Sequence, residues 1–222
     1  MFSIAIDGPA GAGKSTICRA LAKRLSIVHV DTGALYRAVG VYALRSRVRT
    51  DDWAAVTALL PEIHIALHFS PEGQKVEVNG EDYTAAIRLP EASMAASNVS
   101  AIPAVRAFLL ELQRDLARSQ SVVMDGRDIG TVVLPDADIK IFLTASPEVR
   151  AMRRYRELLG KGHDVEYGAL LQEVLQRDKN DSERAAAPLR QAPDAWLCDT
   201  TALDFDESVE TILRYIKEHI SL

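Results

Sequence analysis

The sequence predicts an α/β fold in three layers, with a central parallel sheet of about five strands between helices. Short β-rich runs alternate with helical segments along the chain, which is the pattern of a parallel sheet covered by helices. The expected core strands are 3–6, 27–30, 121–124, 139–143 and 195–198. A chain of 222 residues can form one compact core of this kind and a modest insertion.

The first helix is expected to begin near Lys14, between the first two strands. Ile17, Leu21 and Leu25 recur from there at helical spacing, which gives the helix one apolar face. Strand, glycine-rich loop, helix and strand therefore form a βαβ unit.

Residues 63–87 interrupt the alternation of strands and helices. Large apolar residues at positions 63, 65, 67 and 69 alternate with His64, Ala66 and His68. A turn pair, Asn79–Gly80, follows the next apolar run. This pattern predicts a small antiparallel meander inserted into the core, with His64 and His68 on its surface rather than in a metal site. Helices are expected to follow at about 90–97, 104–118, 147–159, 166–183 and 206–219.

Bulk composition excludes several classes of protein. The net charge of −5 argues against a general nucleic-acid-binding protein, although a local basic pocket can still hold a small anion. No stretch approaches the roughly 18 apolar residues that a membrane span requires, and the chain starts without a secretory signal. Cys18 and Cys198 lie in apolar contexts and predict buried free thiols. We expect a cytoplasmic protein that binds neither nucleic acid nor membranes.

The strongest chemical signal is a phosphate-binding loop that fits G-x-x-x-x-G-K-[ST] between the first strand and the first helix. Glycines let backbone N–H groups point at phosphate oxygens, and the following helix directs its positive end to the same place. Lys14 is expected to reach the β- and γ-phosphates of ATP, the hydroxyl of Ser15 to bind Mg²⁺, and Thr16 to lie near the α-phosphate. The predicted ATP-binding residues are Gly8, Pro9, Ala10, Gly11, Ala12, Gly13, Lys14, Ser15 and Thr16.

Two further motifs follow strands at the edge where open α/β sheets bind ligands. The run 31–37 (DTGALYR) follows the second strand, and 125–128 (DGRD) follows the strand at 121–124. The base-reading and switch motifs of guanine-specific proteins are absent from the sequence, which favours a kinase over a GTP-driven switch. Asp125 is expected either to order the Mg²⁺ shell through water or to cap a loop.

Together these motifs resemble those of the bacterial cytidylate kinases, which are nucleoside monophosphate kinases of the P-loop class. The resemblance covers essentially the whole chain and rests on the loop 8–16, the runs 31–37 and 125–133, the three-stranded insertion and the run 177–184. It implies ATP-dependent phosphorylation of CMP and dCMP, with Mg²⁺ accompanying ATP.

The resemblance also implies the internal organisation of one kinase domain over residues 1–222. An acceptor-binding region is expected at about 32–104, with an insertion at about 60–100, and a short lid at about 150–163. The lid would carry arginines that close over the phosphates, and the candidates are Arg150, Arg153, Arg154 and Arg156.

Acceptor residues are likewise implied by the resemblance. Ser97, Arg106 and Asp128 would read the base, and an aspartate that accepts from the amino group of cytosine is an established pairing. Arg177 and Asp181 would lie near the sugar. Arg37, Arg127 and Arg184 would bind the acceptor phosphate, where bidentate guanidinium contacts are strong. The complete CMP-binding set is Thr32, Tyr36, Arg37, Ser97, Arg106, Arg127, Asp128, Arg177, Asp181 and Arg184, and the catalytic residues are Lys14, Arg127 and Arg184.

Two alternatives remain open at the level of sequence. One is a P-loop kinase for UMP or another small acceptor, and the other is a nucleotide-binding module without catalytic activity. Arginines away from the motifs, such as Arg19, Arg45 and Arg118, are expected on solvated surfaces. We expect the protein to be a monomer.

Overall fold

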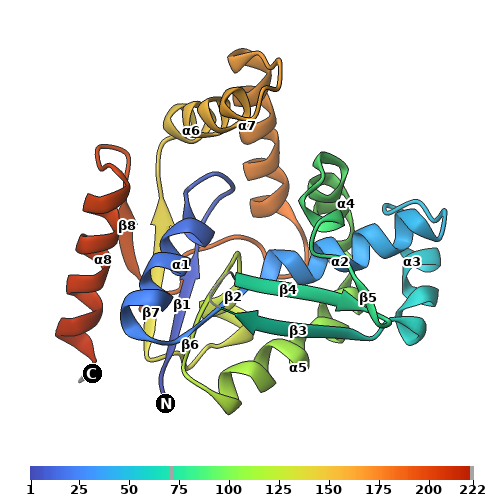
Figure 1. Cartoon of the computed structure of the whole chain (residues 1–222), viewed down its shortest axis with the longest axis horizontal. Coiled ribbons are helices and arrows are strands. Elements are labelled where there is room, and N and C mark those ends of the chain that lie inside the picture. The colour runs from blue at the N-terminus through green and yellow to red at the C-terminus, as the bar shows by residue number, and fades with distance from the viewer. Residues whose placement is uncertain (71–72, 221–222) are drawn as a thin grey trace. The chain divides into compact units, whose positions relative to one another are not determined.

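The computed structural model describes residues 1–70 and 73–220, and it confirms the α/β class. A five-stranded sheet has the strand order β2-β6-β1-β7-β8, and a second sheet has the order β3-β4-β5 (Figure 1). All five predicted core strands form, as β1 (Ser3–Asp7), β2 (Val28–Asp31), β6 (Val122–Gly126), β7 (Ile139–Thr144) and β8 (Trp196–Asp199). Strand β7 pairs in parallel with both β1 and β8, as short strands joined by helical crossovers require.

The chain divides into two compact units, each with its own apolar core. The first unit comprises Met1–Ile27 and Val123–Leu222, and the second comprises Val28–Val122. The predicted acceptor region at about 32–104 and the lid at about 150–163 stay predictions.

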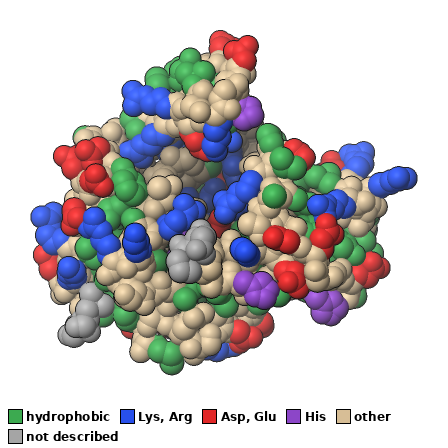
Figure 2. Space-filling view, in the orientation of Figure 1, with side chains coloured by type: hydrophobic (Ala, Val, Ile, Leu, Met, Phe, Trp, Pro, Cys, Tyr) green, Lys and Arg blue, Asp and Glu red, His purple; other side chains and the backbone are tan. Residues whose placement is uncertain are grey.

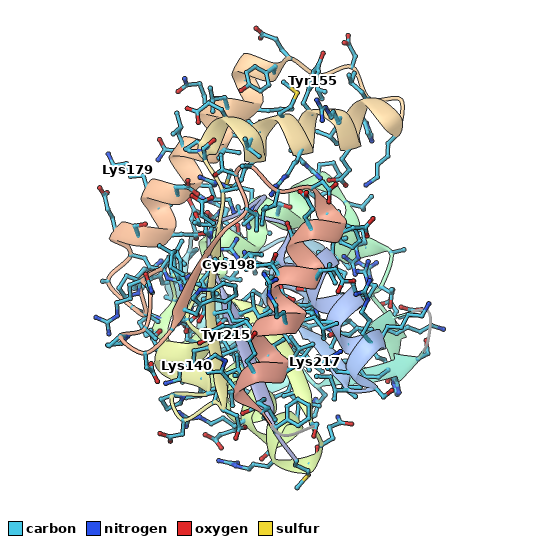
Figure 3. All side chains as sticks on the ribbon, turned by 90° about the vertical axis from the view of Figure 1, so that its left-hand side faces the viewer. Lys140, Tyr155, Lys179, Cys198, Tyr215 and Lys217 are labelled. Carbon is cyan, nitrogen blue, oxygen red and sulfur yellow. The ribbon has the colours of Figure 1, made fainter. Side chains whose placement is uncertain are left out.

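In the first unit, α1 (Lys14–Leu25) and α8 (Phe205–His219) pack on the sheet. Ile17 and Leu21 of α1 and Ile212 of α8 are buried with the apolar side chains of β1 and β7. Figure 3 shows α8 with Tyr215 and Lys217 labelled beside β8, which carries Cys198. Both cysteines are buried free thiols, as predicted.

Two further helices of the first unit, α6 (Pro147–Gly160) and α7 (Tyr167–Glu183), pack against each other (Figure 1). Pro147 occupies the first turn of α6, where its missing N–H has no intrahelical partner to lose, and Ser146 caps the helix by accepting from the N–H of Val149. Tyr155 of α6 meets Tyr167 edge to face, with ring centroids 6.1 Å apart. The two helices confirm the predictions at 147–159 and 166–183.

The second unit contains the predicted antiparallel meander. Strands β3 (Ile65–Ser70), β4 (Gly73–Val78) and β5 (Glu81–Asp82) are joined in the predicted order. Asn79 and Gly80 have φ values of +52° and +83°, which is the left-handed backbone that a two-residue hairpin turn requires. His64 and His68 are exposed, as predicted, and Figure 2 shows histidine side chains at the surface.

Helices α2 (Thr32–Arg45), α3 (Trp53–Leu59), α4 (Pro90–Ser100) and α5 (Pro103–Ser119) complete the second unit. The sequence predicted α4 and α5 but missed α2 and α3. Helix α2 is buried around most of its circumference, so it lacks the single apolar stripe by which a surface helix is recognised. No single helix in the described part of the chain is long and apolar enough to cross a membrane, whereas α4 and α5 pass that test as a pair bent by 102°.

Candidate functional site

The glycine-rich loop runs from the end of β1 into α1, as the sequence predicts. Gly8, Gly11 and Gly13 have φ values of +149°, +76° and +90°, so the loop winds through backbone conformations that favour glycine. A Cβ placed on Gly8 would lie 1.9 Å from the carbonyl oxygen of Leu143 on β7. Any side chain at this position would therefore push the loop away from the sheet.

Lys14 folds back onto the loop that precedes it. Its Nζ donates hydrogen bonds to the carbonyl oxygens of Gly8 (2.7 Å) and Pro9 (2.8 Å). The pKa of Lys14 is lowered to about 7, mainly by burial and then by the positive charge of Arg127, while the negative charge of Asp125 opposes this shift. A bound polyphosphate would bring negative charge next to this buried amine and so favour its charged form.

Two arginines of α6 hold the same loop by its carbonyl groups. Nη1 of Arg150 donates to the carbonyl oxygen of Ala10 at 3.0 Å, and Nη1 of Arg153 lies 3.4 Å from that of Ala12. Arg150 is 3% exposed and also forms a two-point ion pair with Asp178 of α7, at 2.9 and 2.6 Å. These arginines bind the loop through its carbonyl oxygens. The N–H groups of the loop are therefore the groups that can bind an anionic ligand.

The other two predicted lid arginines lie nearer the solvent. Arg154 is exposed and pairs with Glu157 at 3.0 Å, and Arg156 is exposed as well. The four arginines thus divide into a pair that contacts the loop backbone and a pair on the outer part of α6.

Ser15 and Asp125 meet although 110 positions separate them in sequence. The hydroxyl of Ser15, in the first turn of α1, donates to Oδ2 of Asp125 at 2.7 Å. Asp125 lies on β6 and is 4% exposed. A hydroxyl beside a carboxylate is the oxygen donor set that Mg²⁺ prefers. Thr16, the next residue, is exposed.

Five of the predicted acceptor residues gather in the first unit. Arg127 donates through Nε to Asp181 at 2.7 Å, and Arg184 donates to Asp128 at 3.4 Å. Burial raises the pKa of the Asp181 carboxyl, but Arg127, Arg177 and Arg184 together outweigh burial and hold that pKa below its usual value. The cluster holds three guanidinium groups against two carboxylates, which suits it to an anionic ligand.

Asp7 belongs to this neighbourhood but was missed by sequence reasoning. Its two carboxylate oxygens accept the backbone N–H groups of Ile129 and Gly130, each at 2.7 Å. Burial raises the pKa of Asp7 to about 6, although these N–H bonds and Lys14 oppose the rise. The sequence contained one signal for this role, because Asp7 is an acidic residue at the end of an apolar strand and directly precedes the loop.

In the second unit, Asp31 organises the start of α2. Its Oδ1 accepts the N–H of Ala34 and so caps the helix, and its Oδ2 accepts a hydrogen bond of 2.7 Å from Nη2 of Arg37. Gln74 of β4 accepts from the backbone N–H of Asp31 and donates to its carbonyl oxygen. Nε of Arg37 is buried and has no hydrogen-bond partner among the described residues, so this guanidinium retains a donor for a ligand.

Three other predicted acceptor residues of the second unit lie close together. The guanidinium of Arg106 stands over the ring of Tyr36, 5.5 Å from its centroid, and donates to the carbonyl oxygen of Ser100 at 3.2 Å. The hydroxyl of Ser100 in turn donates to the carbonyl oxygen of Ser97 at 2.9 Å. Thr32, at the first turn of α2, is buried. The predicted acceptor residues thus fall into one set on each unit.

Residues 4–218 match the family described as cytidylate kinase. The cytidylate kinase of Carboxydothermus hydrogenoformans is 52% identical over 213 residues, which cover 96% of this chain and 96% of the relative. That of Caldicellulosiruptor saccharolyticus is 50% identical over 212 residues, or 96% of this chain and 94% of the relative. That of Exiguobacterium sp. is 51% identical over 217 residues, or 98% and 97%.

Solved structures also resemble this chain. An uncharacterized protein from Eubacterium ventriosum has a TM-score of 0.51 at 15% identity, covering 98% of this chain and 99% of that chain. At this level of identity the likeness concerns the fold alone.

Proposed function

Because the chain belongs to the cytidylate kinase family, we propose that it transfers the γ-phosphoryl group of ATP to CMP and dCMP, forming CDP and dCDP. The observation that carries the proposal is the cluster of Arg127, Arg177 and Arg184 around two carboxylates, on the same unit as the phosphate-binding loop. A loop alone would serve any nucleotide-binding protein, whereas a second anion-binding cluster suits a kinase with a phosphorylated acceptor.

The donor nucleotide would bind at the loop between β1 and α1. The backbone N–H groups of the loop and Lys14 would hold the phosphates of ATP. The carbonyl oxygens of the loop accept hydrogen bonds from Lys14, Arg150 and Arg153, which leaves the N–H groups to face the ligand. Ser15 would hold Mg²⁺ by its hydroxyl, and Asp125 would hold it through water. The metal would neutralise charge on the triphosphate.

The base of the acceptor would be bound by the residues that the resemblance implies. We propose that Ser97, Arg106 and Asp128 read cytosine, because a carboxylate accepts from its amino group and cationic donors suit its two acceptors. Uracil presents an acceptor where cytosine presents its amino group, so the buried carboxylate of Asp128 would lose a donor, which supports discrimination against UMP.

The rest of the acceptor would be bound by charged groups. Arg177 and Asp181 would lie at the sugar. Arg37, Arg127 and Arg184 would bind the phosphate, and the unsatisfied Nε of Arg37 supports its part in this.

Catalysis would rest on positioning and charge neutralisation. The acceptor is already an anionic phosphate oxygen, so no general base and no covalent enzyme intermediate are needed. Lys14, Arg127 and Arg184 would offset the charge on the phosphates as the γ-phosphoryl group moves in line through a loose transition state. Closure of the lid would exclude water and so limit wasteful hydrolysis of ATP. Arg154 and Arg156 are the better candidates for phosphate contact on closure, because Arg150 and Arg153 already hold the loop.

A panel of acceptors in an assay coupled to ADP release tests the proposal. CMP and dCMP should give the highest kcat/KM among the nucleoside monophosphates. Faster turnover with UMP, AMP or GMP would show that CMP is not the preferred acceptor, while the assignment as a kinase would stand. ATP binding without acceptor-dependent ADP release would instead identify a non-catalytic module. A monomeric state and a cytoplasmic location stay predictions.

A further inference from the structure

Asp7 links the phosphate-binding loop to the segment that carries Asp128. It is the last residue of β1 and directly precedes Gly8, the first residue of the loop. Its side chain is buried, and both carboxylate oxygens bind backbone N–H groups of the turn that follows Asp128. Asp7 therefore holds the backbone of that segment.

The peptide group between Asp128 and Ile129 is held at both ends. Its N–H belongs to Ile129 and donates to Asp7, while its carbonyl oxygen belongs to Asp128 and accepts from Val132 (2.9 Å) and Val133 (3.2 Å). With this peptide plane fixed, the ψ angle of Asp128 is set at 26°, beside a φ of −148°. The direction of the Asp128 side chain follows from these two angles and its rotamer.

We propose that Asp7 is a positioning residue that aims the carboxylate of Asp128 at the acceptor base by holding the backbone of Ile129 and Gly130. This inference rests on the proposed function, in which Asp128 reads cytosine. Asp7 itself would touch neither substrate.

The chemistry of the contact requires a carboxylate. Two N–H donors converge on Asp7, and only an ionised carboxylate offers each of them an acceptor oxygen. An asparagine of the same shape would turn its amide NH₂ toward one of the donors, so one buried N–H would lose its partner.

The charged groups around Asp7 come from three elements. Lys14 of α1 favours its ionised form, and Asp128 disfavours it. Lys140 of β7, labelled in Figure 3, runs its side-chain stem past Gly130 and pairs with Asp194 at 2.7 Å.

Kinetics of Asp7→Asn separate positioning from general support of the fold. Loss of a charge-assisted hydrogen bond predicts an increase in the KM for CMP of about ten-fold or more. The KM for ATP, measured at saturating CMP, should change by less than about three-fold, because the loop's own contacts are untouched. Asp138→Asn is the matched control: this exposed carboxylate accepts the N–H of Ser3 at the opposite end of β1, and both KM values should stay unchanged.

Equal increases in both KM values, or no increase in either, would overturn the inference. Failure of the wild-type protein to phosphorylate CMP would instead reject the proposed function on which the inference rests. The two failures are therefore distinguishable.

A measurement on the wild-type protein covers the case in which Asp7→Asn does not fold. The amide resonances of Ile129 and Gly130 should titrate together with a midpoint of about 6, the pKa of Asp7. Cytidine carries the base and sugar without the charged phosphate. If its binding depends on the ionised carboxylate, saturating cytidine must lower that midpoint, because such coupling is reciprocal. An unchanged midpoint with cytidine bound would contradict the proposed role.

Discussion

The hydroxyl of Ser15 donates a hydrogen bond of 2.7 Å to the carboxylate of Asp125, which joins the first turn of α1 to β6. If this pair holds Mg²⁺, the charge of Asp125 contributes to the affinity for the metal. We expect Asp125→Asn to raise the half-saturating Mg²⁺ concentration by about ten-fold in a steady-state assay at fixed ATP. Asp136→Asn, which neutralises an exposed carboxylate of the same unit, serves as the control. An unchanged Mg²⁺ dependence in Asp125→Asn would remove Asp125 from the metal site.

Lys14 is expected to take up a proton when ATP binds. Burial lowers its pKa to about 7 in the ligand-free protein, so at pH 8 most molecules carry the neutral amine. The triphosphate favours the charged form and raises the pKa again. Calorimetry at pH 8 in buffers of different ionisation enthalpy should therefore detect proton uptake of between about one half and one per ATP bound.

Variants identify the source of this proton. Lys14→Ala should abolish phosphoryl transfer. The protein should still melt cooperatively, because removing a buried amine also removes the free-energy cost of burying it. Lys23→Ala, which changes an exposed lysine of the same helix, should keep both the activity and the proton uptake. Wild-type activity in Lys14→Ala would refute the role of Lys14 in the loop.

The ion pair of Arg150 with Asp178 is expected to stabilise the fold more than its exposed neighbours do. Removing the charge of Asp178 leaves a buried guanidinium partly uncompensated, so Asp178→Asn should lower the free energy of unfolding by about 1–3 kcal/mol. Glu157→Gln removes an exposed partner of Arg154 on the same pair of helices and should cost less than about 0.5 kcal/mol. Urea unfolding measures both values. Equal losses in the two variants would mean that burial of Arg150 does not strengthen the pair.

Arg37 is expected to bind the acceptor phosphate through a planar two-donor contact. A lysine keeps the charge but lacks the planar fork that can pair with Asp31 on one side and make a two-point contact with a phosphate on another, so Arg37→Lys should lower kcat/KM for CMP by about one hundred-fold. Arg45→Lys on the same helix alters an exposed arginine paired with Glu81 and should have little effect. If the two variants behaved alike in steady-state kinetics, Arg37 would not be a phosphate ligand.

Most of the fold could be predicted because its signals are local. The five core strands are short apolar runs bounded by turns or charged residues, and Asn79–Gly80 is a turn pair whose backbone preference is intrinsic. Helix α2 was missed because its burial comes from packing on several sides, which erases the amphipathic period. The π-helical turn Ile129–Val133 was missed as well, and its first two N–H groups bind Asp7, a residue far away in sequence.

The candidate site shows the same division. Loop chemistry and arginines at strand ends follow from motif and position, and the resemblance added the distant acceptor residues. The partners of these residues were not predictable. Asp178 holds Arg150, and Gln74 holds the backbone of Asp31, through contacts between elements that no spacing in the sequence encodes.

The fate of the γ-phosphoryl group tests the proposed activity most directly. The protein is mixed with Mg²⁺, CMP and ATP labelled at the γ-position, and the products are separated and followed by phosphorus NMR. We predict that the label appears in the β-phosphate of CDP, in amounts equal to the ADP formed. Label in inorganic phosphate alone, or none transferred while ATP binds, would contradict the assignment of a cytidylate kinase activity to this chain.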